Sequence, residues 1–276
     1  MIIVGERLNS SRKSVLEALE RRDEQFLIDQ AVNQERAGAS YIDINAAALM
    51  DAETPTLRWA IPLLQKNIRV PLSLDTPNPE AMEEALKIHQ GRALLNSLAG
   101  DAKCLQALIP LIRDYKPRVI ALCLDEKGPP ESSGYALSRA EKMAGLLVRE
   151  GVSPEDIFVD PLVRPIGVDS NSGALFLESV EKIKKHLPGV KTIAGLSNVS
   201  FGLPQRRQLN RTFLVLALSR GLDAAICDPL DEELQATLHA TQALLGKDPS
   251  LKKYLKAVRE RTKSGTEGCS RPPQSG

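Results

Sequence analysis

One segment of the chain, Thr192-Ile193-Ala194-Gly195-Leu196-Ser197-Asn198-Val199-Ser200, sets a pattern that recurs along the whole sequence. It begins as an apolar run typical of a buried strand and ends in a polar stretch with an uncharged amide and two hydroxyls. Three other apolar runs stop in the same way, at Asp75, Asn96 and Asp160. Because the carboxyl ends of parallel strands meet at one end of a sheet, these polar groups are expected to converge on a binding site.

Apolar strand-like runs alternate with amphipathic helical runs along the chain. Strands are expected at residues 2–4, 41–45, 72–75, 93–96, 119–125, 157–160, 192–196 and 223–228. Strand–helix units with strands rich in Val, Ile and Leu indicate a closed parallel barrel of the TIM-type (β/α)8 class. An open doubly wound sheet is the alternative, but the Gly-x-Gly-x-x-Gly of its dinucleotide-binding form does not follow the first strand here.

The sequence predicts a single domain over residues 1–262, a length that suits such a barrel. The tail at residues 263–276 is rich in Gly, Pro and Ser and is expected to be disordered. No apolar run approaches the ~20 residues that cross a bilayer. The N-terminus enters a strand at once and lacks the features of a signal peptide. We therefore expect a cytoplasmic protein with no membrane association.

Charge and composition exclude several classes of function. Lys and Arg number 36 against 35 Asp and Glu, for a net charge of +1. With 4% aromatic residues and no basic run interleaved with aromatics, nucleic acid is not an expected partner. No Cys or His spacing predicts a zinc site; these residues are Cys104, Cys123, Cys227, Cys269, His89, His186 and His239.

Carboxylates and amides dominate the expected strand ends. The set is Glu6, Asp43, Asn45, Asp75, Asn96, Asp125, Asp160, Asn198 and Asp228. Two or more of the Asp residues could hold Mg²⁺, so the residues alone leave a metal open. The other suitable ligand is a neutral heterocycle rich in N–H donors, such as a pterin. The 2-amino group and ring N–H of a pterin match a carboxylate through two parallel hydrogen bonds, and an amide serves an edge with both a donor and an acceptor.

A structural role competes with this interpretation at each position. A single Asp at a strand end is more often a helix cap or a loop acceptor than a ligand. Asp125, which begins a polar loop, and Asp228, which precedes Pro229, suit that role well. For Asn198 the competing role is a buried amide that ties the seventh strand to its loop. The predicted site therefore rests on the set of residues and not on any one of them.

Several motifs together resemble one enzyme family, the pterin-binding methyltetrahydrofolate methyltransferases. The motifs are Ile3-Val4-Gly5-Glu6-Arg7-Leu8-Asn9, Leu74-Asp75, Leu95-Asn96-Ser97, Val159-Asp160-Pro161, Gly195–Ser200 and Asn210-Arg211-Thr212-Phe213. The resemblance covers about residues 1 to 262. It implies an enzyme that moves a methyl group between the N5 nitrogen of tetrahydrofolate and the cobalt of a corrinoid carried by a partner protein. It also implies a homodimer.

The resemblance assigns roles to particular residues. Asp75, Asn96 and Asp160 match the residues that hold the pterin, and Asn198 matches the catalytic amide that reaches N5. Gly195 and Ser197 would line the same wall, and Arg206 stands where the family has an arginine that contacts the folate. None of these residues is expected to bind a metal. Phe201 departs from the polar residue of some members, which puts one folate contact in doubt.

Two other functions stay open. A dihydropteroate synthase shares the barrel and the pterin clamp but uses a Lys and an Arg near its seventh and eighth strands, and the Gly-Leu-Ser-Asn run here has no such Lys. A non-catalytic folate-binding subunit is the alternative from a different class, although a passive binder has no need of an amide at N5. The residues do not decide the direction of methyl transfer, because the same reversible step serves both.

Overall fold

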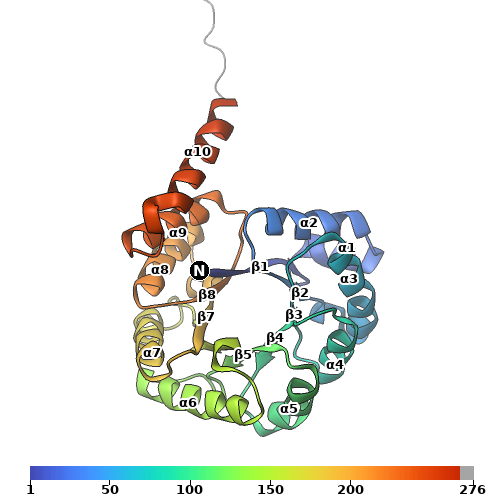
Figure 1. The fold of residues 1–276 in the computed structure, drawn as a ribbon. Helices are drawn as coiled ribbons and strands as arrows, with labels where there is room; N and C mark the ends of the chain where they lie inside the picture. Colours follow the sequence, from blue (N-terminus) through green and yellow to red (C-terminus); the bar gives the residue numbers. More distant parts are fainter. Residues whose placement is uncertain (268–276) are drawn as a thin grey trace, which may run out of the picture. The chain divides into compact units, whose positions relative to one another are not determined.

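Eight parallel strands close into a barrel in the order of the sequence, from β1 to β8 and back to β1 (Figure 1). The structure, a computed structural model, describes residues 1–267. The strands are β1 (Ile2–Asn9), β2 (Tyr41–Asn45), β3 (Leu72–Asp75), β4 (Leu94–Leu98), β5 (Arg118–Leu122), β6 (Ile157–Asp160), β7 (Lys191–Gly195) and β8 (Ala224–Cys227). The prediction of a TIM-type (β/α)8 barrel is therefore confirmed, and the open doubly wound sheet is excluded.

Two compact units make up the chain, Met1–Leu230 and Asp231–Gly276, and all eight strands lie in the first. Helices of the first unit surround the barrel in Figure 1. They are α1 (Lys13–Arg21), α2 (Glu24–Arg36), η1 (Ala47–Ala52), α3 (Glu53–Asn67), α4 (Pro79–Ile88), α5 (Ala102–Tyr115), α6 (Ser133–Arg149), η2 (Pro154–Asp156), α7 (Ser172–His186), η3 (Leu196–Ser200) and α8 (Arg206–Ser219). The second unit holds α9 (Glu232–Leu244), η4 (Pro249–Leu251) and α10 (Lys252–Glu267).

Apolar side chains fill the barrel interior toward the amino-terminal ends of the strands, which we call its lower end. One inward position of most strands contributes to this layer, which comprises Val4, Tyr41, Leu94, Ile120, Phe158, Ile193 and Ala224. A larger apolar cluster packs the outer faces of the strands against the helices, with Leu27, Leu57 and Leu72 fully or almost fully buried. The barrel is thus a packed core and not a pore, as is typical of this architecture.

A polar layer lies directly above the apolar one. Side chains two residues apart on a strand share a face, so the next inward positions follow from the apolar layer by simple counting. Four of them are polar, namely Glu6 after Val4, Asp43 after Tyr41, Asn96 after Leu94 and Asp160 after Phe158. The others are Gly195 after Ile193, Leu122 after Ile120 and Ile226 after Ala224. Asp75 is in register with Asn96 on the adjacent strand, and Leu122 is in register with Asp160, so the two members of each pair lie at the same level. The two-residue period of the strands therefore places polar side chains at the barrel mouth, one step beyond the apolar layer.

Five strand ends differ from the sequence-based expectation, and two of them are β4, which continues to Leu98, and β8, which stops at Cys227. β1 continues to Asn9, β5 stops at Leu122 instead of Asp125, and β7 stops at Gly195 because residues 196–200 form the short helix η3. Asp125 lies in a turn, where its carboxylate accepts the backbone N–H of Lys127 at 2.9 Å. A side chain that satisfies its own loop in this way ends a strand in place of extending it.

The expected C-terminal boundary at residue 262 and the disorder of the tail at residues 263–276 stay predictions. Helix α10 is assigned as far as Glu267. A single Gly within a helix, here Gly265, costs only about 1 kcal/mol relative to Ala and does not by itself stop one. The remainder of the expected tail, residues 268–276, lies outside the described residues.

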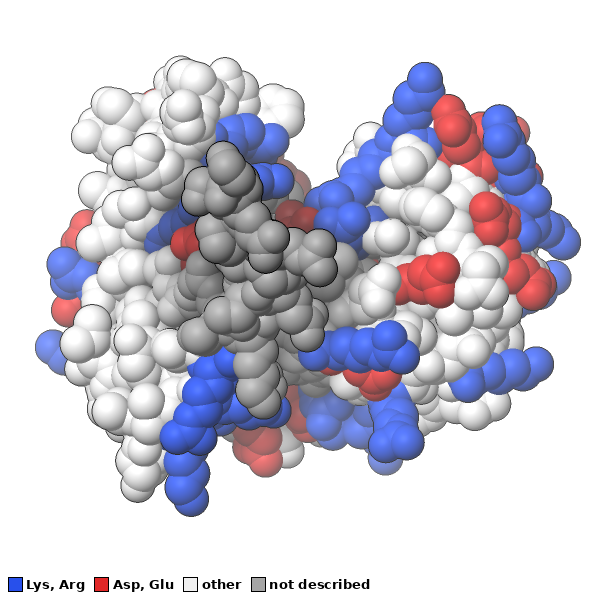
Figure 2. Space-filling view, turned by 90° about the horizontal axis from the view of Figure 1, so that it is seen from above, with Lys and Arg blue, Asp and Glu red and all other residues white. Residues whose placement is uncertain are grey.

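Basic and acidic side chains are interspersed on the face of the molecule shown in Figure 2. The mixture agrees with the net charge of +1 and offers no single-sign field for a polyanion on that face. In the part of the chain that the structure describes, no helix is long and apolar enough to cross a membrane. Within the same residues, no group of three His, Cys, Asp or Glu side chains is arranged to hold a metal ion.

Candidate active site at the barrel mouth

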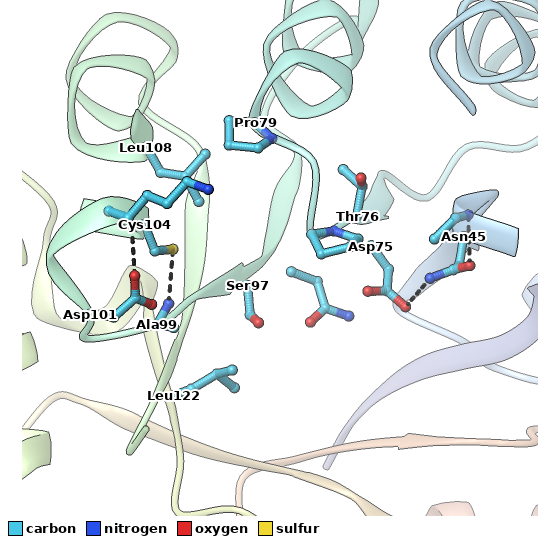
Figure 3. A pocket seen from close by; sticks show the side chains of 14 residues that line it. Asn45, Asp75, Thr76, Pro79, Ser97, Ala99, Asp101, Cys104, Leu108 and Leu122 are labelled. Carbon is cyan, nitrogen blue, oxygen red and sulfur yellow. Dashed lines mark hydrogen bonds between the residues drawn. The ribbon is translucent and has the colours of Figure 1, made fainter. Parts of the chain in front are cut away.

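A cavity of about 580 Å³ opens beside the carboxyl ends of β3 and β4. Its polar wall carries Asn45, Asp75 and Asn96, and Cys104 and Leu108 of α5 lie on the opposite side (Figure 3). A volume of this size suits a small heterocyclic ligand. Of the residues predicted from the sequence, Asp75 and Asn96 line this cavity directly.

Asp75 is held in place by an amide from the neighbouring strand. Asn45 donates from Nδ2 to Oδ2 of Asp75 at 3.0 Å, and the Ser10 hydroxyl donates to Oδ1 of Asn45 at 2.8 Å. Because Asn45 is itself fixed, the Asp75 carboxylate keeps one orientation with one oxygen occupied. Burial raises the pKa of Asp75 above its ordinary value, and the hydrogen bond from Asn45 opposes that rise.

Asn96 is oriented by Asp43, a residue to which the sequence assigned no role. The Asn96 Nδ2 donates to Oδ1 of Asp43 at 3.1 Å, and both side chains are buried. This contact commits the amide nitrogen to the protein. Burial, and then the nearby Asp75 carboxylate, raise the pKa of Asp43 well above its ordinary value. Two neighbouring buried carboxylates disfavour each other's ionised form, which is why the Asp75 charge adds to the effect of burial on Asp43.

Asp160 ends β6 as a nearly isolated carboxylate. Its Oδ1 accepts the backbone N–H of Leu162 at 2.8 Å, and the side chain is buried. Burial raises the pKa of Asp160 to about 7, because the one hydrogen bond does not replace the lost hydration. A ligand with paired N–H donors would supply what this carboxylate lacks. The electrostatics of Asp160 therefore suit recognition of a guanidine-like edge.

Asn198 projects from η3 with its amide exposed. A Cβ at Gly195 would lie 2.8 Å from the Asn198 Nδ2, so the amide rests over a position that only glycine leaves open. Within residues 1–267, the Asn198 side chain makes no hydrogen bond to another side chain. The alternative expected from the sequence, a buried amide tying β7 to its loop, does not describe this conformation.

Arg206 holds the segment that carries Asn198. Its Nη2 donates to the Ser197 carbonyl at 2.8 Å, and its Nε donates to the Ser200 hydroxyl at 3.1 Å. Ser200 in turn donates to Oδ1 of Asn210 at 2.7 Å. The guanidinium also lies 5.8 Å from the centre of the Phe201 ring. Arg206 therefore has a definite structural task in η3, and its predicted contact with folate stays a prediction.

Two carboxylates of the expected set have structural partners. Arg139 donates to Asp125 and, through Nη1, to the carbonyl of Cys123 at 3.1 Å. Asp228 pairs with Nη1 of Arg7 at 2.8 Å and accepts the backbone N–H of Leu230 at 3.0 Å. The bonds to backbone N–H groups, from Lys127 to Asp125 and from Leu230 to Asp228, agree with the loop role that the sequence favoured for both residues. The ion pairs with Arg139 and Arg7 were not expected from the sequence.

The cysteines near the mouth are not poised as nucleophiles. Burial raises the pKa of the Cys104 thiol, and burial likewise raises that of Cys123, so neither favours the thiolate that reacts. Cys104, Cys123 and Cys227 form no disulfide. His89 lies away from the mouth, where it accepts the backbone N–H of Leu72 at 3.3 Å. The polar groups around the cavity are therefore carboxylates, amides and hydroxyls, together with the ammonium group of Lys103.

Comparison with known proteins adds independent information to this geometry. Residues 5–228 match the family described as pterin binding enzyme. The chain is 33% identical over 262 residues to a methylcorrinoid:tetrahydrofolate methyltransferase of Eubacterium limosum, covering 94% of this chain and 97% of that protein. It is 28% identical over 239 residues to a methionine synthase of Mycobacterium tuberculosis, covering 82% of this chain and 20% of the synthase.

Solved structures share the fold at lower identity. A dihydropteroate synthase of Xanthomonas albilineans superposes with a TM-score of 0.68 at 18% identity, covering 89% of this chain and 92% of that one. The dihydropteroate synthase of Yersinia pestis gives a TM-score of 0.60 at 15% identity, covering 89% and 93%. At these identities the likeness concerns the barrel alone.

Proposed function

This chain belongs to the family of pterin-binding enzymes, and we propose that it transfers a methyl group between the N5 nitrogen of tetrahydrofolate and the cobalt of a corrinoid protein. The Eubacterium limosum relative, which it matches over almost its whole length, carries the name of that activity. The name gives the direction from the methylcorrinoid to tetrahydrofolate. The same residues serve the reverse direction, since the step is reversible.

The observation that carries the proposal is the pairing of a buried polar clamp with an exposed amide at the same mouth. Asp75 and Asn96 pair on the adjacent strands β3 and β4, and Asp160 ends β6. The edge of a pterin supplies the donors that such groups accept. Asn198 lies in η3, directly after β7, with its side chain exposed, and we infer that its amide meets a nitrogen of the bound ring.

The mechanism follows from the weakness of N5 as a leaving group. When methyltetrahydrofolate gives its methyl to cobalt(I), the N5–CH3 bond breaks and its electron pair stays on the nitrogen. A hydrogen bond from Asn198 that strengthens as this charge develops lowers the free energy of the transition state for methyl transfer. Gly195 and Ser197 line the wall beside that amide. The corrinoid is a second substrate, brought to the mouth by its own protein.

Dihydropteroate synthesis is disfavoured by the chemistry at the end of β7. That enzyme class uses a lysine near its seventh strand, and here the strand ends at Gly195 with the neutral Ser197 and Asn198 beyond it. The cation beside this segment is Arg206, which donates to the Ser197 carbonyl. The nearest lysine on β7 is Lys191, at the opposite end of the strand. A passive folate-binding subunit would have no use for an exposed amide over Gly195.

Assembly and location complete the proposal. The resemblance to the methyltransferases supports a homodimer, for which light scattering of the purified protein is the direct test. We assign the protein to the cytoplasm, in agreement with three cysteines that form no disulfide. Cofractionation with cytoplasmic markers in cells would check that assignment.

The test is an anaerobic assay with methyltetrahydrofolate and chemically reduced free cobalamin, following the absorbance of cob(I)alamin. Enzyme-dependent formation of methylcobalamin would establish the activity. The reverse assay, with methylcobalamin and tetrahydrofolate, should show the same enzyme dependence. Folate binding with no transfer to free cobalamin or to a corrinoid protein in either direction would leave only the passive binder, and no folate binding would reject the assignment.

A further inference from the structure

Glu6 occupies the inward position of β1 in the polar layer, beside the segment that carries Asn198. The Ser197 hydroxyl donates to Oε2 of Glu6 at 3.4 Å, and Nη2 of Arg12 lies 3.6 Å from Oε1. The Glu6 side chain is only 20% exposed. Both distances are long for contacts of a carboxylate. Glu6 is therefore largely removed from solvent, and its two partners can move closer when a substrate binds.

The other carboxylates of the polar layer already have close partners. Asn96 donates to Asp43 at 3.1 Å, Asn45 donates to Asp75 at 3.0 Å, and Arg7 pairs with Asp228 at 2.8 Å. Asp160 accepts the Leu162 N–H at 2.8 Å and is predicted to hold the pterin edge. Among the carboxyl groups of this layer in the described chain, Glu6 differs in two ways. It contacts η3 through Ser197, and it has no short hydrogen bond.

Charged groups of both signs surround Glu6. Arg12 from the loop after β1 and Arg206 from α8 favour its ionised form, while Asp228 after β8 disfavours it, and Glu6 in turn raises the pKa of Asp43 on β2. Burial is the largest effect and raises the pKa of Glu6 above its ordinary value. A carboxyl group whose pKa is raised by burial holds its proton more readily than an exposed one, as a proton donor requires.

We propose that Glu6 holds the proton that N5 exchanges during methyl transfer, and that the hydroxyl of Ser197 carries it between them. The inference rests on the proposed function and adds a proton route to it. Asn198 supplies a hydrogen bond but has no proton to give, so a separate titratable group completes the chemistry. Because Glu6 acts through Ser197, it is a positioning residue for the proton and not a group that touches the substrate.

The step balances in both directions. When cobalt(I) takes the methyl, its electron pair forms the Co–CH3 bond and the pair of the broken N5–CH3 bond stays on N5. N5 takes the hydroxyl proton of Ser197, the Ser197 oxygen takes the carboxyl proton of Glu6, and Glu6 is left ionised. In the reverse direction N5 attacks the methyl of the methylcorrinoid, the Co–C pair returns to cobalt, and the N5 proton passes through Ser197 to ionised Glu6.

The test is the pH profile of methyl transfer in single-turnover assays with free cobalamin. From methyltetrahydrofolate to cobalt, the wild-type rate should fall as pH rises through the pKa of Glu6, because the protonated carboxyl is consumed. Glu6→Gln keeps the shape and the hydrogen-bond acceptor but cannot titrate. It should lower the rate about 10²-fold and flatten this limb of the profile, as expected for the loss of a general acid.

Ser197→Ala provides a second, independent variant because it removes only the hydroxyl. It should flatten the same limb with Glu6 intact. Both variants should bind folate within about threefold of the wild type in a titration, which a purely structural role would not predict. Glu17→Gln is the matched control. Glu17 lies on α1 with its side chain 46% exposed, and its partner Lys13 is 3.9 Å away.

The outcomes separate the inference from the proposed function. If wild type transfers methyl but both variants keep its rate within twofold and its pH dependence, the proton route is wrong and the enzyme assignment stands. A tenfold or greater loss of folate affinity in both variants also overturns it, because Glu6 and Ser197 would then be binding groups. If Glu6→Gln fails to fold, Ser197→Ala decides alone. Absence of transfer by the wild type rejects the proposed function itself.

Discussion

Gly195 and Asn198 fit together so closely that a side chain at one would displace the other. A Cβ added at residue 195 would lie 2.8 Å from Nδ2 of Asn198, which is closer than such atoms approach in proteins. The backbone of Gly195 has a negative φ, −71°, so the glycine is not required by its conformation. It is required by the amide that lies above it.

Gly195→Ala should therefore impair transfer more than folding. The methyl group must push the Asn198 amide aside, and a misplacement of about 1 Å at a reacting group can cost 10²-fold in rate. We expect a large fall in turnover with little change in the midpoint of urea unfolding. An Ala variant with full activity would mean that the Asn198 amide works from another position.

Asn198→Ala removes the predicted hydrogen bond to N5. Loss of one transition-state donor costs about 2.7–4 kcal/mol, or 10²–10³ in rate. Because the amide is exposed and holds no side chain of the described protein, stability should change by less than about 0.5 kcal/mol. Steady-state assays measure the expected loss of turnover, and chemical unfolding measures the expected small change in stability. Turnover within twofold of wild type would remove Asn198 from the mechanism.

Asp43→Ala tests the residue that orients Asn96. The buried Nδ2 of Asn96 would lose its acceptor, now 3.1 Å away, and an unsatisfied buried donor costs about 1–3 kcal/mol. Folate affinity should fall as well, because the Asn96 amide could then rotate. Asp125→Ala is a useful contrast, since it also removes a hydrogen-bonded carboxylate but one in a loop outside the polar layer. Folate affinity unchanged in Asp43→Ala would show that Asn96 is held by other contacts.

Strand periodicity made the barrel and the level of the polar layer predictable, whereas contacts across the mouth were not. The strands at residues 41–45, 72–75 and 157–160 were predicted with the bounds that the structure shows. The bond between Asn96 and Asp43 joins residues 53 positions apart, and it depends on the register of three strands. No local signal in the sequence distinguishes Asp43 from the other strand-end carboxylates. Its role follows only once Asn96 is seen beside it.

Arg206 is a residue whose importance the sequence indicated but whose contacts it did not predict. The resemblance to the methyltransferases marks the position as a folate contact, but in the structure its Nε and Nη2 atoms hold Ser200 and Ser197. A sequence match indicates that a residue is needed. It does not show whether that residue contacts the ligand directly or supports a loop that contacts the ligand. Arg206→Lys should loosen η3 and lower turnover in the same sense as Gly195→Ala. A raised folate Kd with unchanged turnover would favour direct contact instead.

The pH dependence of folate binding tests the role of Asp160. Burial raises the pKa of this carboxyl to about 7 in the empty site, and an Asp paired with the pterin edge must be ionised to accept both N–H groups. Binding below pH 7 therefore releases a proton, so affinity should fall as pH decreases, by about tenfold per pH unit well below the pKa. Above pH 7 the carboxylate is already ionised and affinity should level off.

Asp160→Asn gives this prediction a matched control. The amide cannot titrate and offers one acceptor where the carboxylate offers two, so affinity at pH 8 should be lower and its decline below pH 7 should disappear. Isothermal titration in buffers of different ionisation enthalpy would measure the proton released by wild type directly. A wild-type affinity that stays constant between pH 5.5 and 8 would show that Asp160 does not meet the pterin as a carboxylate. The clamp would then rest on Asp75 and Asn96, with the buried charge of Asp160 serving another purpose.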